Sequence, residues 1–344
     1  MPGLLGVAVV GFGGLLMGSG GFPIKLMRKF KFEHFWFLAI LIGLVILPWV
    51  ITLVFCPHPF AAYSTVDPSL LVKANLCSLG WGVANLLCGL CFVRIGFALT
   101  GGILTGLGVS IGVTVPMIVK GSGMFNASPD LGSPAGRIVL LGAGIMLVGV
   151  VLTGFAGFGR DRELNKLQQR QGSFLVGLIM AIAAGILSVG MSFSFVYSQG
   201  PIVSAMKAQG AGEIPANFAV WAVALIGGAL VNLLYPAYLM TKNKSWHVLG
   251  ESRRELAWCL FMGLSSCSAI ALLGKGMLLL GVLGASIGFG IQQAAQLLGN
   301  MGVGFIGGEW RGVRGTPRIQ MYLAILVLLV AAVVMAYGNS FTKS

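Results

Sequence analysis

Apolar runs of about twenty residues recur along the whole chain, and most charged residues lie in the short stretches between them. A transmembrane α-helix needs roughly 20 predominantly apolar residues, whereas a transmembrane β-strand needs only about 10 alternating ones. The pattern therefore predicts an all-α polytopic membrane protein rather than a β-barrel. We expect ten transmembrane helices, at residues 3–23, 35–55, 70–92, 97–119, 138–157, 173–197, 217–240, 256–274, 283–307 and 319–338.

The composition supports a lipid environment, because 57% of the residues are hydrophobic, only 9% are charged and the mean hydropathy is +0.93. Soluble domains carry about 25% charged residues. The net charge of +13 raises the question of a nucleic-acid partner. We expect none, because the basic residues lie in short clusters between apolar runs, as in membrane proteins. The first run has no basic segment before it and no polar cleavage region after it, so it is expected to be a helix rather than a signal peptide.

Basic residues also predict the orientation of the chain. Most of the 22 lysines and arginines lie in the odd-numbered connections, such as "KLMRKFK", "GRDRELNKLQQR" and "EWRGVRGTPR". Lysine and arginine are enriched in cytoplasmic loops. The odd-numbered connections should therefore be cytoplasmic, and both termini should be periplasmic.

Two short internal matches indicate a duplication. "GGLLMGSGGF" (13–22) resembles "AGILSVGMSF" (184–193), and "GRIVLLGAGIML" (136–147) resembles "PRIQMYLAILVL" (317–328). Five spans per half is an odd number, so the second half would insert upside down. We therefore expect a first five-helix repeat at 1–157, a basic cytoplasmic connection at 158–172 and a second, inverted repeat at 173–344. Inverted repeats are typical of transporters whose substrate site lies near the midplane.

The ninth span carries amide side chains at a helical spacing. Gln292, Gln296 and Asn300 lie four residues apart and form one stripe, and Gln293 lies about 100° round the helix from Gln292. Amides facing lipid would cost several kcal/mol each, so the stripe should face protein or water. It is either a set of hydrogen bonds between helices or the wall of a hydrated cavity. Carboxamides both donate and accept, which suits a neutral polyhydroxylated solute.

Other polar positions could share that cavity. Trp81 and Asn85 lie one turn apart in the third span, and Ser188 and Ser192 lie one turn apart in the sixth. An indole ring can stack on the apolar face of a sugar, although tryptophan is also common at membrane interfaces. Asn217, Trp221, Asn232 and Trp258 are further polar or amphipathic residues of the seventh and eighth spans.

No acidic residue lies in the middle of a predicted span. A proton-coupled carrier needs a titratable group that reaches its pathway, and Lys25, Glu33 and Glu309 at the ends of spans are the candidates. The chain has no P-loop, no HExxH motif and no nucleophile–base arrangement. "CGLC" (88–91) has no second pair or histidine partner, so we interpret its cysteines as packing residues. We expect no enzyme activity, no cofactor and no metal site.

Several segments resemble the L-rhamnose–proton symporter family of the drug/metabolite transporter superfamily. They are "KFEHFWFLAILIGLVILPW" (31–49), "WGVANLLCGL" (81–90), "RIGFALTGGILTGLGVSIGVTVPMIV" (94–119), "GMSFSF" (190–195) and "EWRG" (309–312). The resemblance implies a ten-helix carrier with two inverted repeats that takes up a deoxyhexose with protons across the bacterial inner membrane. It also implies that Lys25, Glu33, Trp81, Asn85 and Glu309 occupy family positions. The segment "FMGLSSCSAIALLG" (261–274) departs from the family, whose members are richer in aromatic and polar residues there.

These observations predict a secondary-active carrier that works by alternating access and takes up a small neutral sugar, with rhamnose as the family's example. The alternative is a metabolite or drug exporter of the same superfamily. A cavity lined by aromatic side chains without the amide stripe would favour the exporter.

Overall fold

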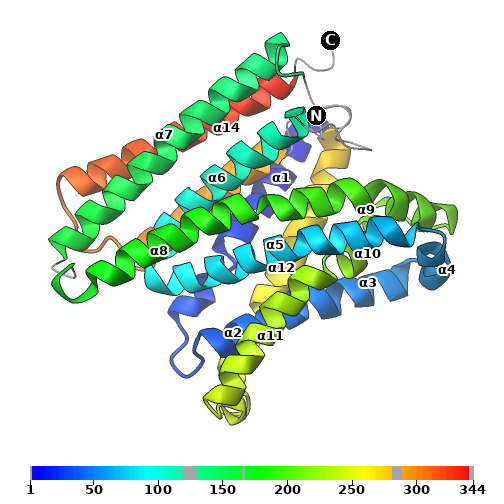
Figure 1. Ribbon diagram of the computed structural model, residues 1–344, viewed down its shortest axis with the longest axis horizontal. Coiled ribbons are helices and arrows are strands. Elements are labelled where there is room, and N and C mark those ends of the chain that lie inside the picture. Colours follow the sequence, from blue (N-terminus) through cyan, green and yellow to red (C-terminus); the bar gives the residue numbers. More distant parts are fainter. Residues whose placement is uncertain (1, 119–129, 165–166, 281–288, 341–344) are drawn as a thin grey trace.

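The computed structural model describes residues 2–118, 130–164, 167–280 and 289–340 (Figure 1). All regular elements within these residues are helical. The α-helices are α1 (Pro2–Ser19), α2 (Phe32–Ile40), α3 (Leu47–Phe55), α4 (Pro59–Ser64), α5 (Pro68–Arg94), α6 (Phe97–Ile118), α7 (Pro134–Glu163), α8 (Leu167–Leu187), α9 (Val189–Ala208), α10 (Glu213–Ala224), α11 (Ile226–Lys242), α12 (Arg253–Leu280), α13 (Phe289–Ile306) and α14 (Thr316–Ser340). Single-turn 3-10 segments lie at Phe22–Lys25 and Trp246–Gly250, and a π-helical segment lies at Leu41–Ile46.

Seven helical stretches of the described residues are long and apolar enough to cross a bilayer, and the bent pair α10–α11 makes an eighth. Apolar stretches within the described parts of α6 and α13, Phe97–Ile111 and Ala294–Ile306, are two further candidates. The prediction of an all-helical polytopic membrane protein is confirmed. Each of the ten expected ranges overlaps one of these helices, although residue 119 of the fourth range and residues 283–288 of the ninth lie outside the described residues. The number ten itself stays a prediction.

Three of the expected spans are not single, uninterrupted α-helices. The second changes from α2 through the π-helical segment to α3, where Pro48 lacks the N–H that a regular α-helix would use. The sixth is longer than expected, because α8 and α9 follow one another with a break only at Ser188. The seventh bends by 56° between α10 and α11, at Leu225. Apolarity is similar on both sides of each interruption, so the hydrophobic pattern does not reveal where the helices are interrupted.

Helices α7 and α14 lie side by side along one edge of the bundle and run antiparallel (Figure 1). Their direction follows from two close contacts: Gly142 lies against Met335, and Gly159 lies against Pro317. At these points a glycine on α7 leaves room for a side chain of α14. The last turn of α14 therefore lies level with the first turn of α7.

Helices α1 and α13 run parallel, since Gly14 approaches Gln292 and Gly18 approaches Gln296. Helix α6 runs antiparallel to α13, because Gly101 approaches Asn300 while Gly304 approaches Ala98. It is antiparallel to α7 as well, where Gly102 meets Thr153 and Gly106 meets Val150. Taken in sequence, these directions place the start of α1 and the end of α14 at the same end of the bundle.

The five basic connections meet at the opposite end. The contacts that join them are Lys25 with Glu309, Arg160 with the carbonyl of Ile95, the amide of Arg314 with Glu163, and the amide of Arg28 with Glu255. The common end of these connections agrees with the alternation of charge along the sequence.

Candidate functional site

The amide stripe of α13 faces away from the lipid-exposed side of that helix. Leu298 is 41% exposed, whereas Gln292 and Asn300 are buried. Leu298 is two residues from both Gln296 and Asn300, and two residues turn a helix by about 200°. The stripe therefore points into the bundle, as its spacing predicts. The side chain of Gln293 lies outside the part of the chain that the structure describes.

Two neighbouring helices border the stripe very closely. A methyl group at Gly14 or Gly18 of α1 would lie 2.3 Å from Gln292 O or 2.1 Å from Gln296 O. On the other side, a methyl group at Gly101 of α6 would lie 2.4 Å from the Asn300 Cβ. The stripe thus occupies the angle between α1 and α6, and glycines allow both helices to come this near.

The stripe makes few hydrogen bonds of its own. Gln292 Nε2 donates to Gln296 Oε1 at 3.3 Å, within α13. Gln292 Oε1 is buried and has no hydrogen-bond partner among the described residues. Within the same residues, no side chain of the stripe is hydrogen-bonded to another helix. A buried polar atom without a partner costs about 1–3 kcal/mol, and the described residues give no support to the alternative of hydrogen bonds between helices.

Trp81 and Asn85 of α5 also point into the bundle. The exposed Leu79 and Val83 lie two residues from them, about 200° round the helix. Asn85 Nδ2 donates to Asn232 Oδ1 of α11 at 3.1 Å. The indole of Trp81 packs on α11, where a methyl group at Gly228 would lie 2.6 Å from the ring.

Ser188, the next candidate residue, packs against α6. It lies at the break between α8 and α9, and its hydroxyl donates to Gly185 O at 2.6 Å. A methyl group at Gly108 of α6 would lie 2.9 Å from the Ser188 Oγ. Two residues later, a methyl group at Gly190 would lie 2.3 Å from Cys77 O and 2.9 Å from Trp81 N of α5. The start of α9 therefore touches both α6 and α5. The side chain of Ser192 lies outside the described part.

Thr105 is a polar residue that the sequence analysis did not single out. It is 6% exposed and lies on the same face of α6 as Gly101 and Gly108. Thr114 and Thr153 each donate their hydroxyl to the carbonyl four residues earlier, as helical threonines commonly do. The Thr105 hydroxyl has no partner among the described residues. The signal in the sequence is its position between two glycines at helical spacing.

Lys25 and Glu309 form an ion pair at the basic end of the bundle. Lys25 Nζ lies 2.5 Å from Glu309 Oε1, and the side chain of Glu309 is only 7% exposed. The carboxylate also accepts from the backbone amides of Phe97 at 2.8 Å and Ala98 at 3.3 Å. These are the first amides of α6, where the helix dipole stabilises a negative charge. The pair therefore links the ends of α1 and α13 to the start of α6.

Glu33 lies in a different part of the same end. It is buried at the start of α2 and accepts from Asn243 Nδ2 at 3.2 Å. The next residue, His34, accepts from the Lys31 amide at 3.0 Å and contacts Ser245 through its Nε2 atom at 3.1 Å. These contacts dock α2 on the segment after α11. The structure thus brings two of the three titratable candidates together and leaves Glu33 apart.

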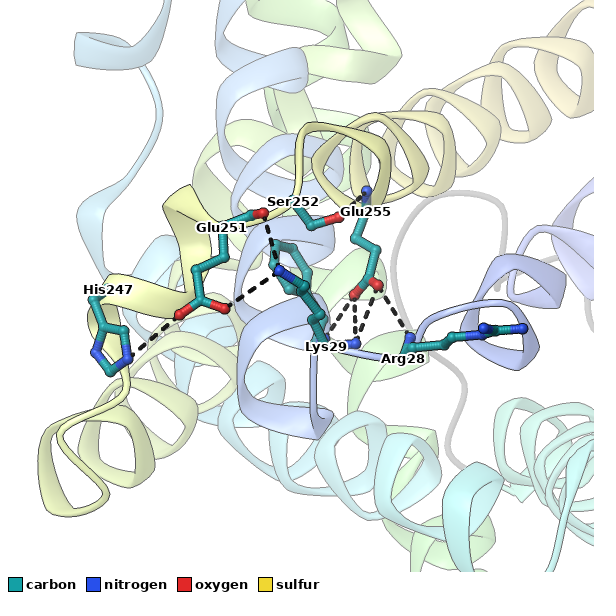
Figure 2. A network of polar contacts seen from close by, with 7 residues as sticks. Arg28, Lys29, His247, Glu251, Ser252 and Glu255 are labelled. Carbon is teal, nitrogen blue, oxygen red and sulfur yellow. Dashed lines mark hydrogen bonds and ion pairs between the residues drawn. The ribbon is translucent and has the colours of Figure 1, made fainter.

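A second carboxylate, Glu255, holds the connection between α1 and α2 in place (Figure 2). It lies in the first turn of α12 and accepts from the backbone amides of Arg28 at 3.1 Å, Lys29 at 3.1 Å and Phe30 at 2.6 Å. Glu251 makes only exposed contacts nearby, such as the 3.7 Å ion pair with Lys29. The sequence analysis did not single out Glu255, which directly precedes the expected span at 256–274.

The chain is similar to a known protein family and to several named proteins. A family model described as L-rhamnose-proton symport protein matches residues 9–341. Proteins named L-rhamnose-proton symporter from Yersinia pestis bv. Antiqua (strain Antiqua) and Yersinia pseudotuberculosis serotype O:1b (strain IP 31758) are each 30% identical over 213 residues. That alignment covers 62% of this chain and 60% of each relative, which is less than two thirds of their length. No solved structure matches the chain significantly.

Proposed function

The chain belongs to the L-rhamnose-proton symport protein family, and from this premise we propose that it is a proton-coupled carrier of a small neutral sugar of the rhamnose type. The family match over residues 9–341 is the observation that carries the proposal. The relatives are named for the same activity. The match gives no support to the exporter of the same superfamily. The carrier would take up its substrate across the bacterial inner membrane by alternating access.

The proposed architecture is ten spans in two inverted five-helix repeats, 1–157 and 173–344. The pattern of neighbours supports it. Helix α1 packs on α12 and α13, and the equivalent pair α8–α9 packs on α5 and α6. Equivalent helices also pair with one another, as in α6 with α13 and α7 with α14. In this arrangement the basic end is cytoplasmic, both termini are periplasmic, and one half would move against the other.

The proposed sugar site lies between α1, α5, α6, α9 and α13. Gln292, Gln293, Gln296 and Asn300 would provide amides on one side, with Trp81, Asn85, Ser188 and Ser192 on the other. The unpartnered Gln292 Oε1 supports this assignment, because a sugar hydroxyl would satisfy it. A neutral sugar needs both donors and acceptors, and carboxamides and hydroxyls supply both.

We assign proton coupling to Glu309 and Lys25 rather than to Glu33. The Glu309 carboxylate binds Lys25 and the first amides of α6, at the end of the same three helices that carry or border the amide stripe. Protonation of Glu309 would remove the charge that holds these groups. The inner ends of α1, α6 and α13 could then separate and open the site to the cytoplasm.

Transport in proteoliposomes tests the proposal. Labelled L-rhamnose, fucose, xylose and glucose are each measured with and without an inward proton gradient. We expect gradient-stimulated uptake of one sugar. Glu309→Gln should keep exchange of that sugar across the membrane but lose the stimulation by the gradient. If no sugar moves under any condition, the sugar-carrier proposal is wrong.

Mutation of the stripe tests the site separately. Gln296→Ala should raise the KM for the transported sugar by roughly three- to tenfold, since one hydrogen bond contributes about 0.5–1.5 kcal/mol. Leu298→Ala, on the exposed side of the same helix, is the matched control and should behave like the unmodified protein. If the two substitutions change the KM equally, the stripe is not part of the sugar site.

A further inference from the structure

Asn232 lies at the point where α2, α5 and α11 meet, and it is completely buried. Its Oδ1 accepts from Trp36 Nε1 at 2.9 Å and from Asn85 Nδ2 at 3.1 Å. Its Nδ2 donates to the carbonyls of Gly82 at 2.9 Å and Gly228 at 2.8 Å. Four hydrogen bonds satisfy the whole carboxamide.

The orientation of this carboxamide follows from its partners. An indole N–H can only donate, so the atom that faces Trp36 must be the oxygen. The backbone carbonyls of Gly82 and Gly228 can only accept, so the atom that faces them must be the nitrogen. Turning the amide by 180° would break three contacts at once. The assignment of oxygen and nitrogen, which is often ambiguous for asparagine, is therefore determined here by chemistry.

The orientation of the Asn232 carboxamide determines the orientation of the Asn85 carboxamide. Asn232 presents only its oxygen to Asn85, so Asn85 must turn its NH₂ group toward α11. The Asn85 Oδ1 is left pointing away from α11, and it receives no hydrogen bond from the described residues. Asn85 itself is half-buried on the inward face of α5, one turn from Trp81. A free acceptor thus lies on the inward face of α5, one helical turn from Trp81.

We propose that Asn232 is a positioning residue for substrate recognition, which holds Asn85 so that its Oδ1 accepts a hydrogen bond from one hydroxyl of the sugar. This inference rests on the proposed function, and it adds the direction of one specific hydrogen bond. The substrate must donate at this position, so an analogue that cannot donate there is rejected. A fluorine atom in place of the hydroxyl is such a group, because it keeps the size but has no hydrogen to donate.

Competition experiments in proteoliposomes test this direction. Exchange of labelled L-rhamnose is inhibited by unlabelled rhamnose and by analogues in which each hydroxyl in turn is replaced by fluorine. For the unmodified protein we expect one analogue to compete about two- to tenfold less well because it cannot donate to Asn85, the range of one hydrogen bond. In Asn85→Ala that analogue should lose this extra penalty, while the ratios for the other analogues stay unchanged.

Asn232→Leu tests the positioning role. Asn85 is still present in this variant but its amide can turn over, so the penalty for the same analogue should fall to about that of Asn85→Ala. Trp36→Phe removes one donor but leaves both carbonyl contacts that orient Asn232, so discrimination should persist. A general packing defect would change all ratios together and would not separate these variants.

The outcomes distinguish this inference from the proposed function. If the unmodified protein exchanges rhamnose but Asn85→Ala keeps the full penalty, the recognition role of Asn85 is wrong. If Asn232→Leu is folded and keeps it, the positioning role is wrong. If Asn232→Leu does not fold, the Trp36→Phe variant still tests the positioning role. Loss of discrimination in Trp36→Phe, to the level of Asn85→Ala, would show that the two carbonyl contacts do not orient Asn232. If the unmodified protein exchanges no sugar, the proposed function fails first.

Discussion

Substitution of Gly18 by alanine should disrupt the candidate site through the backbone. A methyl group at this position of α1 would lie 2.1 Å from Gln296 O and 2.9 Å from Asn300 N, whereas real Cβ atoms essentially never come nearer than 3.0 Å. Helix α13 would therefore have to move away from α1 by about 0.9 Å at this level. The obstacle is backbone on both sides, so no side-chain rotation can relieve it.

Helix α13 has no room for that movement. On its other side Asn300 lies against Gly101 of α6, where even a methyl group would come within 2.4 Å of the Asn300 Cβ. Overpacking of a close-packed interior typically costs 1–3 kcal/mol, which corresponds to roughly a 5- to 150-fold change in an equilibrium constant. We expect Gly18→Ala to lower sugar exchange in proteoliposomes by at least about fivefold and to lower the unfolding temperature in detergent.

Gly11 provides the matched control for this prediction. It lies on the same face of α1, seven residues earlier, and a methyl group there would be 3.9 Å from the Ile291 Cγ2, an ordinary contact. Gly11→Ala should therefore retain exchange and stability. If Gly18→Ala and Gly11→Ala behave alike, the close α1–α13 crossing does not support the site, and the reasoning from backbone distance is refuted.

Two further substitutions test the basic end of the bundle. Glu255→Ala should lower the free energy of unfolding by roughly 3 kcal/mol, because three backbone amides lose a buried charged acceptor. The control Glu251→Ala should lower it by less than about 1 kcal/mol, as is usual for exposed ion pairs. Thermal unfolding in detergent measures both variants, and equal shifts would contradict the anchoring role of Glu255. Gly96→Ala should impair proton-driven uptake, because its φ of +89° strains any side chain and its methyl group would lie 2.4 Å from the Glu309 carboxylate. The control Gly210→Ala carries the same backbone strain at φ +90°, but its methyl group would lie 3.9 Å from Pro57. An equal loss of uptake in this control would show that backbone strain, and not displacement of the Glu309 carboxylate, causes the effect.

The sequence predicts the helices well because a bilayer permits few alternatives. Without water in the hydrocarbon core, a single spanning segment must satisfy its backbone as a helix, and runs of apolar residues identify such segments directly. The break at Ser188 and the bend at Leu225 escaped prediction because the two sides of each have similar apolarity. The number of spans and the inverted repeats stay predictions, because parts of the fourth and ninth expected spans lie outside the described residues.

The direction of the amide stripe was predictable, but most partners were not. Periodicity places Gln296 opposite Leu298, and the exposure of Leu298 agrees. Periodicity relates residues of one helix only, so it could not pair Lys25 with Glu309, which lies 284 residues away. It instead left Glu33, the nearer carboxylate in sequence, as an equal candidate, and Glu33 lies with Asn243.

The hydrogen bonds that each buried carboxamide makes distinguish residues that look alike in the sequence. Asn232 and Gln292 are both buried carboxamides within apolar helices. All the bonding capacity of Asn232 is used by protein groups, so Asn232 can orient Asn85 but offers no free group to a substrate. Gln292 Oε1 has no partner within the described residues. Because an unsatisfied buried acceptor is costly, a state in which a donor such as a sugar hydroxyl reaches Gln292 is stabilised relative to the empty one. The same comparison gives Asn232 an indirect role through Asn85 and places Gln292 in direct contact with the substrate of the proposed site.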